Sequence, residues 1–162
     1  MLKISRMLVV ALVATGFASA ASAQGFDQRR LFFGAGLGAN SISGGAHALG
    51  AQFFTGYNFR EIAPKFSIDA EAGYMDSGKF EKDGNTVSDS AKGLWATAVP
   101  RYMITPQLEL LARVGYDFGD DDGVMVGIGG GYIVNKNVKL RLEYVSRDHI
   151  DSIQFNLLLY PW

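Results

Sequence analysis

From Leu31 to Leu159 the chain carries an apolar residue at almost every second position. The alternation comes in segments that are separated by clusters of Gly, Asp, Asn, Ser and Pro. Because successive side chains of a strand point to opposite faces, a period of two residues indicates strands, and the turn-forming clusters mark where each one ends. The pattern therefore predicts eight strands, in residues 31–39, 49–59, 65–74, 93–102, 108–118, 124–132, 138–144 and 153–159.

The connections between these strands alternate between polar loops and tight turns. Outer-membrane barrels have this asymmetry, with longer extracellular loops and short periplasmic turns. The alternation predicts antiparallel strands in up-and-down order, with four extracellular loops and both chain ends on the periplasmic side. The loops are expected at residues 40–46, 76–90, 119–122 and 146–151, and the turns at residues 60–64, 104–106 and 135–136.

The second face of the strands combines many glycines with long charged side chains. Glycine walls leave volume for charged side chains that cross a narrow interior and pair there. A soluble sandwich would instead hide its apolar face and turn the polar face to water. We therefore expect an apolar exterior and a lumen filled by ion pairs, and a soluble barrel with the apolar face inward is the alternative. The predicted lumen charge network consists of Asp69, Glu71, Arg101, Glu109, Arg113, Lys139, Arg141 and Glu143.

Aromatic residues on the apolar face gather near the strand ends. Tyr102 and Tyr132 lie toward the turns, and Tyr74 and Tyr144 lie toward the loops. Two such girdles are expected of a barrel in lipid, where amphipathic rings settle at the level of the headgroups. An open sheet in hydrocarbon would leave edge N–H and C=O groups unpaired, so the last strand must meet the first. The predicted fold is all-β, an eight-stranded antiparallel up-and-down transmembrane β-barrel in the cell outer membrane of a Gram-negative bacterium.

The N-terminus has the layout of a secretory signal peptide. Two basic residues precede an apolar run of about a dozen residues, too short for a membrane-spanning helix, and the triplet Ala21-Ser22-Ala23 follows. We expect cleavage before Gln24. This divides the chain into a signal peptide, residues 1–23, and an outer-membrane barrel domain, residues 24–162.

The composition of the chain argues against several classes of function. Without Lys3 and Arg6 the chain holds 13 basic residues against 16 acidic ones, which argues against a nucleic-acid partner. It has no Cys, which excludes disulfides, thiolate metal sites and a Cys nucleophile. No cofactor is expected. The run Asp120-Asp121-Asp122 fits no EF-hand spacing and is interpreted as a solvated turn rather than a metal site.

Catalysis would depend on His47 or His149, the only two histidines. His149 has Asp148 and Ser152 close in sequence, but this spacing does not place a base and a nucleophile on one face of a strand. We therefore predict no enzymatic activity. A lipid A-modifying outer-membrane enzyme and a narrow low-conductance channel remain as alternatives.

The C-terminal stretch GVMVGIGGGYIVNKNVKLRLEYVSRDHIDSIQFNLLLYPW resembles the closing hairpins of the small outer-membrane β-barrel family that includes the OmpA transmembrane domain, OmpX and the opacity proteins. It has a Gly-rich strand that ends in an aromatic residue, a short Asn/Lys turn, an LRLEY strand, a polar loop and a final strand. The resemblance implies a structural or adhesion-type surface role rather than one activity. It implies outer-membrane lipid and lipopolysaccharide, the barrel-assembly machinery, and host or surface ligands of the loops as partners.

The same resemblance implies a C-terminal signal that the barrel-assembly machinery reads, formed by Leu158, Tyr160 and Trp162. These residues alternate out of step with the apolar face that contains Leu159. Pro161 is also unusual beside a terminal aromatic residue. We therefore expect a bulge or a slip of register near Leu159.

Overall fold

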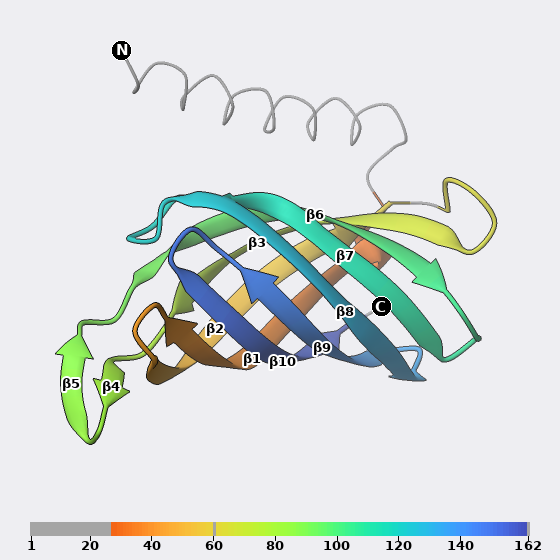
Figure 1. The fold of residues 1–162 in the computed structure, drawn as a ribbon. Coiled ribbons are helices and arrows are strands. Elements are labelled where there is room, and N and C mark those ends of the chain that lie inside the picture. The colour runs from red at the N-terminus through yellow and green to blue at the C-terminus, as the bar shows by residue number, and fades with distance from the viewer. Residues whose placement is uncertain (1–26, 60, 162) are drawn as a thin grey trace, which may run out of the picture.

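The computed structural model describes residues 27–59 and 61–161, so the predicted signal peptide, residues 1–23, lies outside the described residues. Strands account for almost all regular structure in that part of the chain (Figure 1). The elements are the 3-10 turn η1 (Gln28–Arg30) and the strands β1 (Leu31–Ile42), β2 (Ala46–Asn58), β3 (Phe66–Asp76), β4 (Phe80–Lys82), β5 (Asn85–Ser88), β6 (Lys92–Met103), β7 (Leu108–Asp117), β8 (Gly123–Asn135), β9 (Val138–Ser146) and β10 (Ile150–Leu159).

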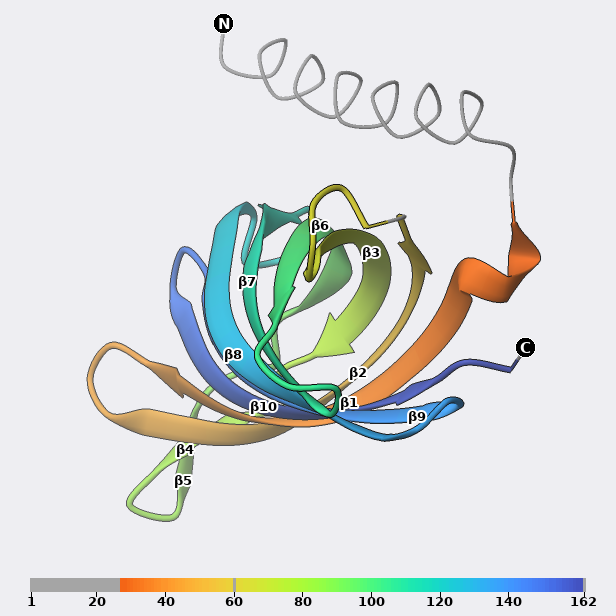
Figure 2. The same cartoon turned by 90° about the vertical axis from the view of Figure 1, so that its right-hand side faces the viewer.

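Eight of these strands close into an antiparallel barrel. Consecutive strands pair around the sheet, and β1 pairs with both β2 and β10, so the first and last strands meet. Figure 2 shows the strands curving around a common interior. The predicted fold class is thus confirmed. No helix within residues 27–59 and 61–161 is long and apolar enough to cross a membrane.

The two faces of the barrel strands are as the alternation predicts. Large apolar side chains point outward, and Leu49 and Phe53 are about 70% exposed, at 72% and 68%. The polar positions face the lumen, where Asp69 and Glu109 are 0% exposed. Hydrocarbon favours contact with apolar side chains and disfavours contact with charged ones. The apolar exterior is therefore suited to contact with lipid.

The barrel strands extend further toward the loops than the sequence predicts. The expected loop at residues 40–46 is a short turn, because β1 runs to Ile42 and β2 begins at Ala46. Gly44 and Gly45 both have positive φ angles, of 98° and 80°, which lets the chain reverse within three residues. The expected loop at residues 146–151 likewise shrinks to the three residues between β9 and β10.

The long loop expected at residues 76–90 contains a small β-hairpin outside the barrel, formed by β4 and β5. Asp83 and Gly84 have positive φ angles, of 52° and 79°, as a two-residue hairpin turn requires. The expected polar loop thus contains ordered structure that the sequence analysis did not predict, and its Asp-Gly pair was the signal for the hairpin. The hairpin joins the sheet through one pairing, His47 with Glu81, and projects from the end opposite the C-terminus (Figure 1).

The predicted bulge near Leu159 is also wrong. β10 pairs with β1 and with β9 without a shift of register up to Leu159. No bulge is needed because Leu158 and Tyr160 stay on the lumen side, where both belong to an apolar cluster with Phe32. Pairing within the sheet ends at Leu159, before Pro161, which has no N–H to donate.

The hairpin should be a separable appendage. Gly84→Val places a β-branched residue at a φ of 79°, which strains the turn, so the hairpin should open while the barrel stays intact. Limited trypsin digestion should then cleave at Lys79 or Lys82 faster than in the wild type, with an unchanged unfolding midpoint. Asn85→Ala, beside the turn, is the matched control and should digest like the wild type. A lower unfolding midpoint of the barrel in Gly84→Val would contradict the independence of the hairpin from the barrel.

Candidate functional site in the barrel lumen

The lumen holds two groups of charged side chains, and the lower group lies toward the periplasmic turns. Arg101 contacts both carboxylates of this group, with Nε 2.8 Å from Asp69 Oδ2 and Nη1 2.8 Å from Glu109 Oε2. Lys139 Nζ lies 3.0 Å from Glu109 Oε1. All four side chains are buried, and two cations face two carboxylates.

The upper group is a closed ring of two arginines and two glutamates. Arg113 bridges Glu71 and Glu143, with its Nη2 3.0 Å from Glu71 Oε2 and its Nε 2.9 Å from Glu143 Oε2. Arg141 bridges the same pair, with its Nη1 2.6 Å from Glu71 Oε1 and its Nε 3.1 Å from Glu143 Oε1. Each guanidinium fork thus meets two carboxylates, which is a favourable geometry for arginine. The structure brings together all eight charged residues that the sequence placed in the lumen.

Glycines on neighbouring strands make room for these side chains. A Cβ added at Gly131 would lie 2.5 Å from Glu109 Oε1, and one added at Gly129 would lie 2.8 Å from Glu143 Cγ. Any larger residue at these positions would occupy the space of a paired carboxylate. The mixture of glycine and charge in the sequence therefore reflects direct packing of one against the other.

An apolar cluster shares the lumen with the charges, and sequence reasoning missed it. Its rings stack with the arginines, since Arg113 lies 5.1 Å from the centre of the Trp95 ring and Arg141 lies 5.4 Å from that of Phe54. The Phe54 and Trp95 rings are 5.6 Å apart. The available signal was the position of these large residues on the glycine-rich face. The buried members are Phe32, Phe54, Met75, Trp95, Met125, Val145 and Leu158.

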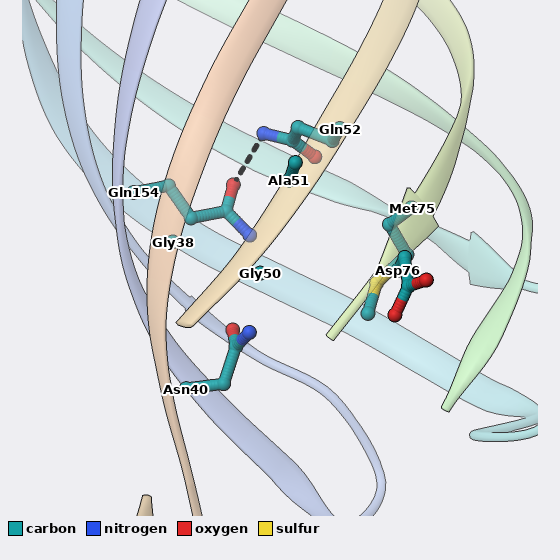
Figure 3. Close-up of a pocket in the computed structure, with 8 residues that line it drawn as sticks. All are labelled: Gly38, Asn40, Gly50, Ala51, Gln52, Met75, Asp76 and Gln154. Atoms are coloured by element: carbon teal, nitrogen blue, oxygen red, sulfur yellow. Dashed lines mark hydrogen bonds between the residues drawn. The ribbon is translucent and has the colours of Figure 1, made fainter. Parts of the chain in front are cut away.

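Amide side chains fill the part of the lumen nearer the extracellular loops. Gln52 Nε2 donates to Gln154 Oε1 at 2.9 Å and to Asn156 Oδ1 at 2.7 Å, and Asn156 Nδ2 donates to Glu143 Oε1 at 3.0 Å. Beside them a cavity of about 10 Å³ is bordered by Asn40 (Figure 3). That volume is enough for about one water molecule. Charges, rings and amides together leave little free space along this part of the lumen.

At the extracellular rim the residues considered for catalysis meet only in part, because His149 Nδ1 lies 3.2 Å from Asp148 Oδ2 but the His149 ring does not bond to Ser152. His149 Nδ1 lies 3.0 Å from Asp121 Oδ1, whereas the Ser152 hydroxyl accepts from Arg147 at 3.1 Å and donates to Asn40 at 2.6 Å. A base bonded to the nucleophile is the arrangement that hydroxyl catalysis requires. The His149 and Ser152 side chains thus have separate partners.

The acidic loop after β7 is held by the protein itself. Asp121 accepts from the His149 main-chain N–H at 3.0 Å, and Asp120 accepts from the Lys92 N–H at 3.0 Å. Within residues 27–59 and 61–161, no group of three or more His, Asp or Glu side chains has the geometry of a metal site. Arg147 is buried at this rim and pairs with Asp117 at 3.2 Å. Burial lowers the pKa of Arg147, and the Asp117 charge opposes that shift.

Two of the three residues of the predicted assembly signal face the lumen. Leu158 is fully buried, and the Tyr160 ring packs against that of Phe32 at 5.1 Å. Lys139 Nζ lies 5.5 Å from the centre of the Tyr160 ring. Trp162 lies outside the described residues.

A closed eight-stranded barrel with an apolar exterior and a paired polar lumen defines a small membrane β-barrel. The family model described as the outer membrane protein beta-barrel domain matches residues 9–157. The chain belongs to this family, and it lies in the outer membrane, where its apolar exterior contacts lipid. No curated protein matches the sequence.

Solved structures with the same fold have diverged far in sequence. Ail, the attachment invasion locus protein of Yersinia pestis, in complex with the heparin analogue sucrose octasulfate, is 16% identical with a TM-score of 0.53; the match covers 80% of this chain and 95% of Ail. Neisserial surface protein A is 14% identical with a TM-score of 0.52, over 80% of this chain and 95% of that one. The outer membrane enzyme PagL is 15% identical with a TM-score of 0.50, over 79% and 98%. At such identities the likeness establishes the fold alone.

Removing one member of the upper ring should destabilise the barrel strongly. Arg141→Met leaves Glu71 and Glu143 each short of one cation in a buried site, which should cost about 3–5 kcal/mol. The free energy of unfolding, measured by urea titration in lipid vesicles, tests this. Lys92→Met is the matched control, because Lys92 pairs with Asp76 at the exposed rim, where a pair contributes less than about 1 kcal/mol. Equal losses of unfolding free energy in the two variants would contradict a large contribution of the ring to the stability of the barrel.

Proposed function

We propose that this protein is a non-enzymatic outer-membrane barrel that reinforces the membrane and presents its extracellular loops to a surface partner. The observation that carries the proposal is the filling of the lumen. Four cations and four carboxylates pair there, and rings and amides occupy the space beside them. Because the lumen is filled in this way, we place the function of the molecule on its surface loops rather than in its interior.

The separation of His149 from Ser152 supports the non-enzymatic reading. The ring of His149 is 77% exposed and bonded to Asp121, and Ser152 is buried under Arg147. An acyl hydrolase of this type would need its base within reach of its nucleophile. We accordingly rank the lipid A-modifying enzyme below the structural and surface role, and we propose no cofactor.

The filled lumen also disfavours the narrow channel, and conductance across planar bilayers tests this. The wild type should give no steady open-channel steps, because both the ion-pair ring and the rings of Phe54 and Trp95 occupy the lumen. The double variant Phe54→Ala, Trp95→Ala removes the two rings that pack against Arg113 and Arg141, and steady steps in this variant would verify that the assay detects an opened lumen. Its folding is checked by heat-modifiable gel mobility. Steady conductance of the wild type would refute the plugged barrel.

The β4–β5 hairpin is the loop best built to meet a partner. Its base is anchored, because Phe80 is 2% exposed and packs with Ala46 and Ile150. Lys82 Nζ also donates to the Gly44 carbonyl at 2.7 Å. All residues of the turn and of β5 are exposed. A fixed base with an exposed tip presents side chains at little cost in ordering entropy.

The charge of the extracellular end indicates which partner chemistry it favours. The loops and adjoining strand ends, residues 43–48, 76–92, 117–123 and 146–151, contain four basic residues against ten acidic ones. We propose a basic partner surface, since complementary potentials steer association. Ail was solved with a sulfated heparin analogue, a polyanion that this surface would repel. The acidic residues are Asp76, Glu81, Asp83, Asp89, Asp117, Asp120, Asp121, Asp122, Asp148 and Asp151.

Binding of charged probes tests this proposal. Protein in nanodiscs of zwitterionic lipid should bind polylysine, and the polylysine affinity should fall as salt rises. The hairpin variant Glu81→Gln, Asp83→Asn should bind polylysine more weakly. Glu61→Gln, at the periplasmic end, is the control and should match the wild type. Equal polylysine affinity in the hairpin variant and the Glu61→Gln control would contradict the proposed partner chemistry.

Two further roles rest on the sequence and family resemblance. We propose that the signal peptide, residues 1–23, directs export and that the barrel-assembly machinery recognises Leu158, Tyr160 and Trp162. Since Leu158 and Tyr160 face the lumen of the folded barrel, that recognition would precede closure of β10 against β1. Contact of the exterior with lipopolysaccharide is proposed on the same basis.

A further inference from the structure

A groove on the exterior of the barrel crosses the strands β2, β3 and β6, and its volume is about 590 Å³. Its floor is a row of three short side chains that are paired across these strands. The next row toward the extracellular loops consists of three large, exposed side chains, which form a wall. Sites for small molecules commonly have volumes of about 300–1,000 Å³, so the groove is large enough to hold part of a ligand. The floor residues are Thr55, Ala72 and Ala96, and the wall residues are Phe53, Tyr74 and Leu94.

The lining of this groove disfavours a polar or charged occupant. None of its lining residues is charged. The Thr55 hydroxyl, which is the polar group of the floor, already donates to the Phe32 carbonyl at 3.0 Å. The groove is continuous with the exterior that contacts lipid, and Tyr74 belongs to the aromatic girdle nearer the extracellular loops. An acyl chain of the outer leaflet is therefore the occupant that this lining favours.

An ion pair lies beside the groove at the level of the extracellular rim. Asp76 and Lys92 pair across β3 and β6, one row beyond Tyr74 and Leu94 and about 7 Å further along the strands. Lys92 Nζ lies 2.9 Å from Asp76 Oδ2, and the two side chains are 48% and 40% exposed. Asp76 Oδ1 also accepts from the Gly78 N–H at 3.0 Å. Because an ammonium group has three donors and a carboxylate about four acceptor sites, both groups retain capacity for a ligand.

We propose that this groove is a binding site for one phospholipid with a phosphoethanolamine headgroup, held in the outer leaflet. One acyl chain occupies the groove, the phosphate contacts Lys92, and the ammonium of the headgroup contacts Asp76. The charge of the extracellular end selects this headgroup, because ten acidic residues against four basic ones repel a polyanionic lipid but not a zwitterionic one. The site is independent of the surface role that we propose for the loops.

Native mass spectrometry of the folded protein, released from micelles of an uncharged detergent after lipid titration, tests the proposal. Phosphatidylethanolamine should bind as a single copy. It should bind at lower concentrations than phosphatidylglycerol with the same acyl chains, because phosphatidylglycerol has no ammonium group to contact Asp76. Lipid A, which carries phosphates without that ammonium group, should also bind more weakly. Tighter binding of phosphatidylglycerol or lipid A, or a protein dimer in place of the lipid complex, would overturn the proposal.

Two variants separate the acyl-chain site from the headgroup site. Ala72→Leu fills the floor of the groove with an apolar side chain that suits the lipid-facing surface. It should weaken phosphatidylethanolamine binding about tenfold, the scale expected when roughly two methylene groups lose their contact with the groove. Ala112→Leu makes the same change on the exterior of β7, outside the groove, and should bind like the wild type.

The headgroup variant changes the lipid preference instead. Asp76→Asn keeps an acceptor for the Gly78 N–H and removes the charge that the ammonium contacts, so it should abolish the preference for phosphatidylethanolamine over phosphatidylglycerol. Heat-modifiable gel mobility checks that each variant is folded. Wild-type affinity in Ala72→Leu, or an unchanged lipid preference in Asp76→Asn, would overturn the proposal.

Discussion

The structure depends on the absence of water from hydrocarbon, which obliges every main-chain N–H and C=O in the membrane to find a partner in the protein. Pairing of β1 with β10 meets that requirement by closing the sheet. Closure with eight strands leaves an interior only wide enough for side chains. The lumen must therefore be packed like a protein core, yet the exterior has already taken most of the large apolar residues. Paired charges fill the remaining volume, and glycines provide the space for them.

Much of this was predictable because a strand has a period of two. Inward positions such as Arg113 and Glu143 could be assigned by counting from apolar neighbours, and closure of the barrel followed from the need to pair edge N–H and C=O groups in hydrocarbon. Partners could not be assigned, because Glu71 and Arg141 are far apart in sequence and meet only through the curvature of the barrel. Phe54 and Trp95 were visible on the glycine-rich face, but their stacking on arginines depends on side-chain directions that alternation does not specify.

The two ends of the barrel differ in charge and in construction. The extracellular end is acidic and carries an anchored hairpin, whereas the periplasmic segments, residues 27–30, 61–65 and 135–137, contain four basic residues against two acidic ones. The neutral charge network between them separates the two ends physically. Ligand chemistry at one end can therefore differ in sign from that at the other, although one continuous sheet forms both.

The ring of Arg113, Arg141, Glu71 and Glu143 has a consequence for how the sequence can evolve. Replacing one charged residue of the ring leaves its buried partner without a counter-charge. A stable variant therefore requires two or more substitutions together, or passage through variants of lower stability. The tip of the β4–β5 hairpin has no such coupling, because its residues face solvent and only its base touches the barrel. Homologues should therefore retain the ring as correlated positions while the tip diversifies freely, and surface recognition can be renewed without rebuilding the barrel.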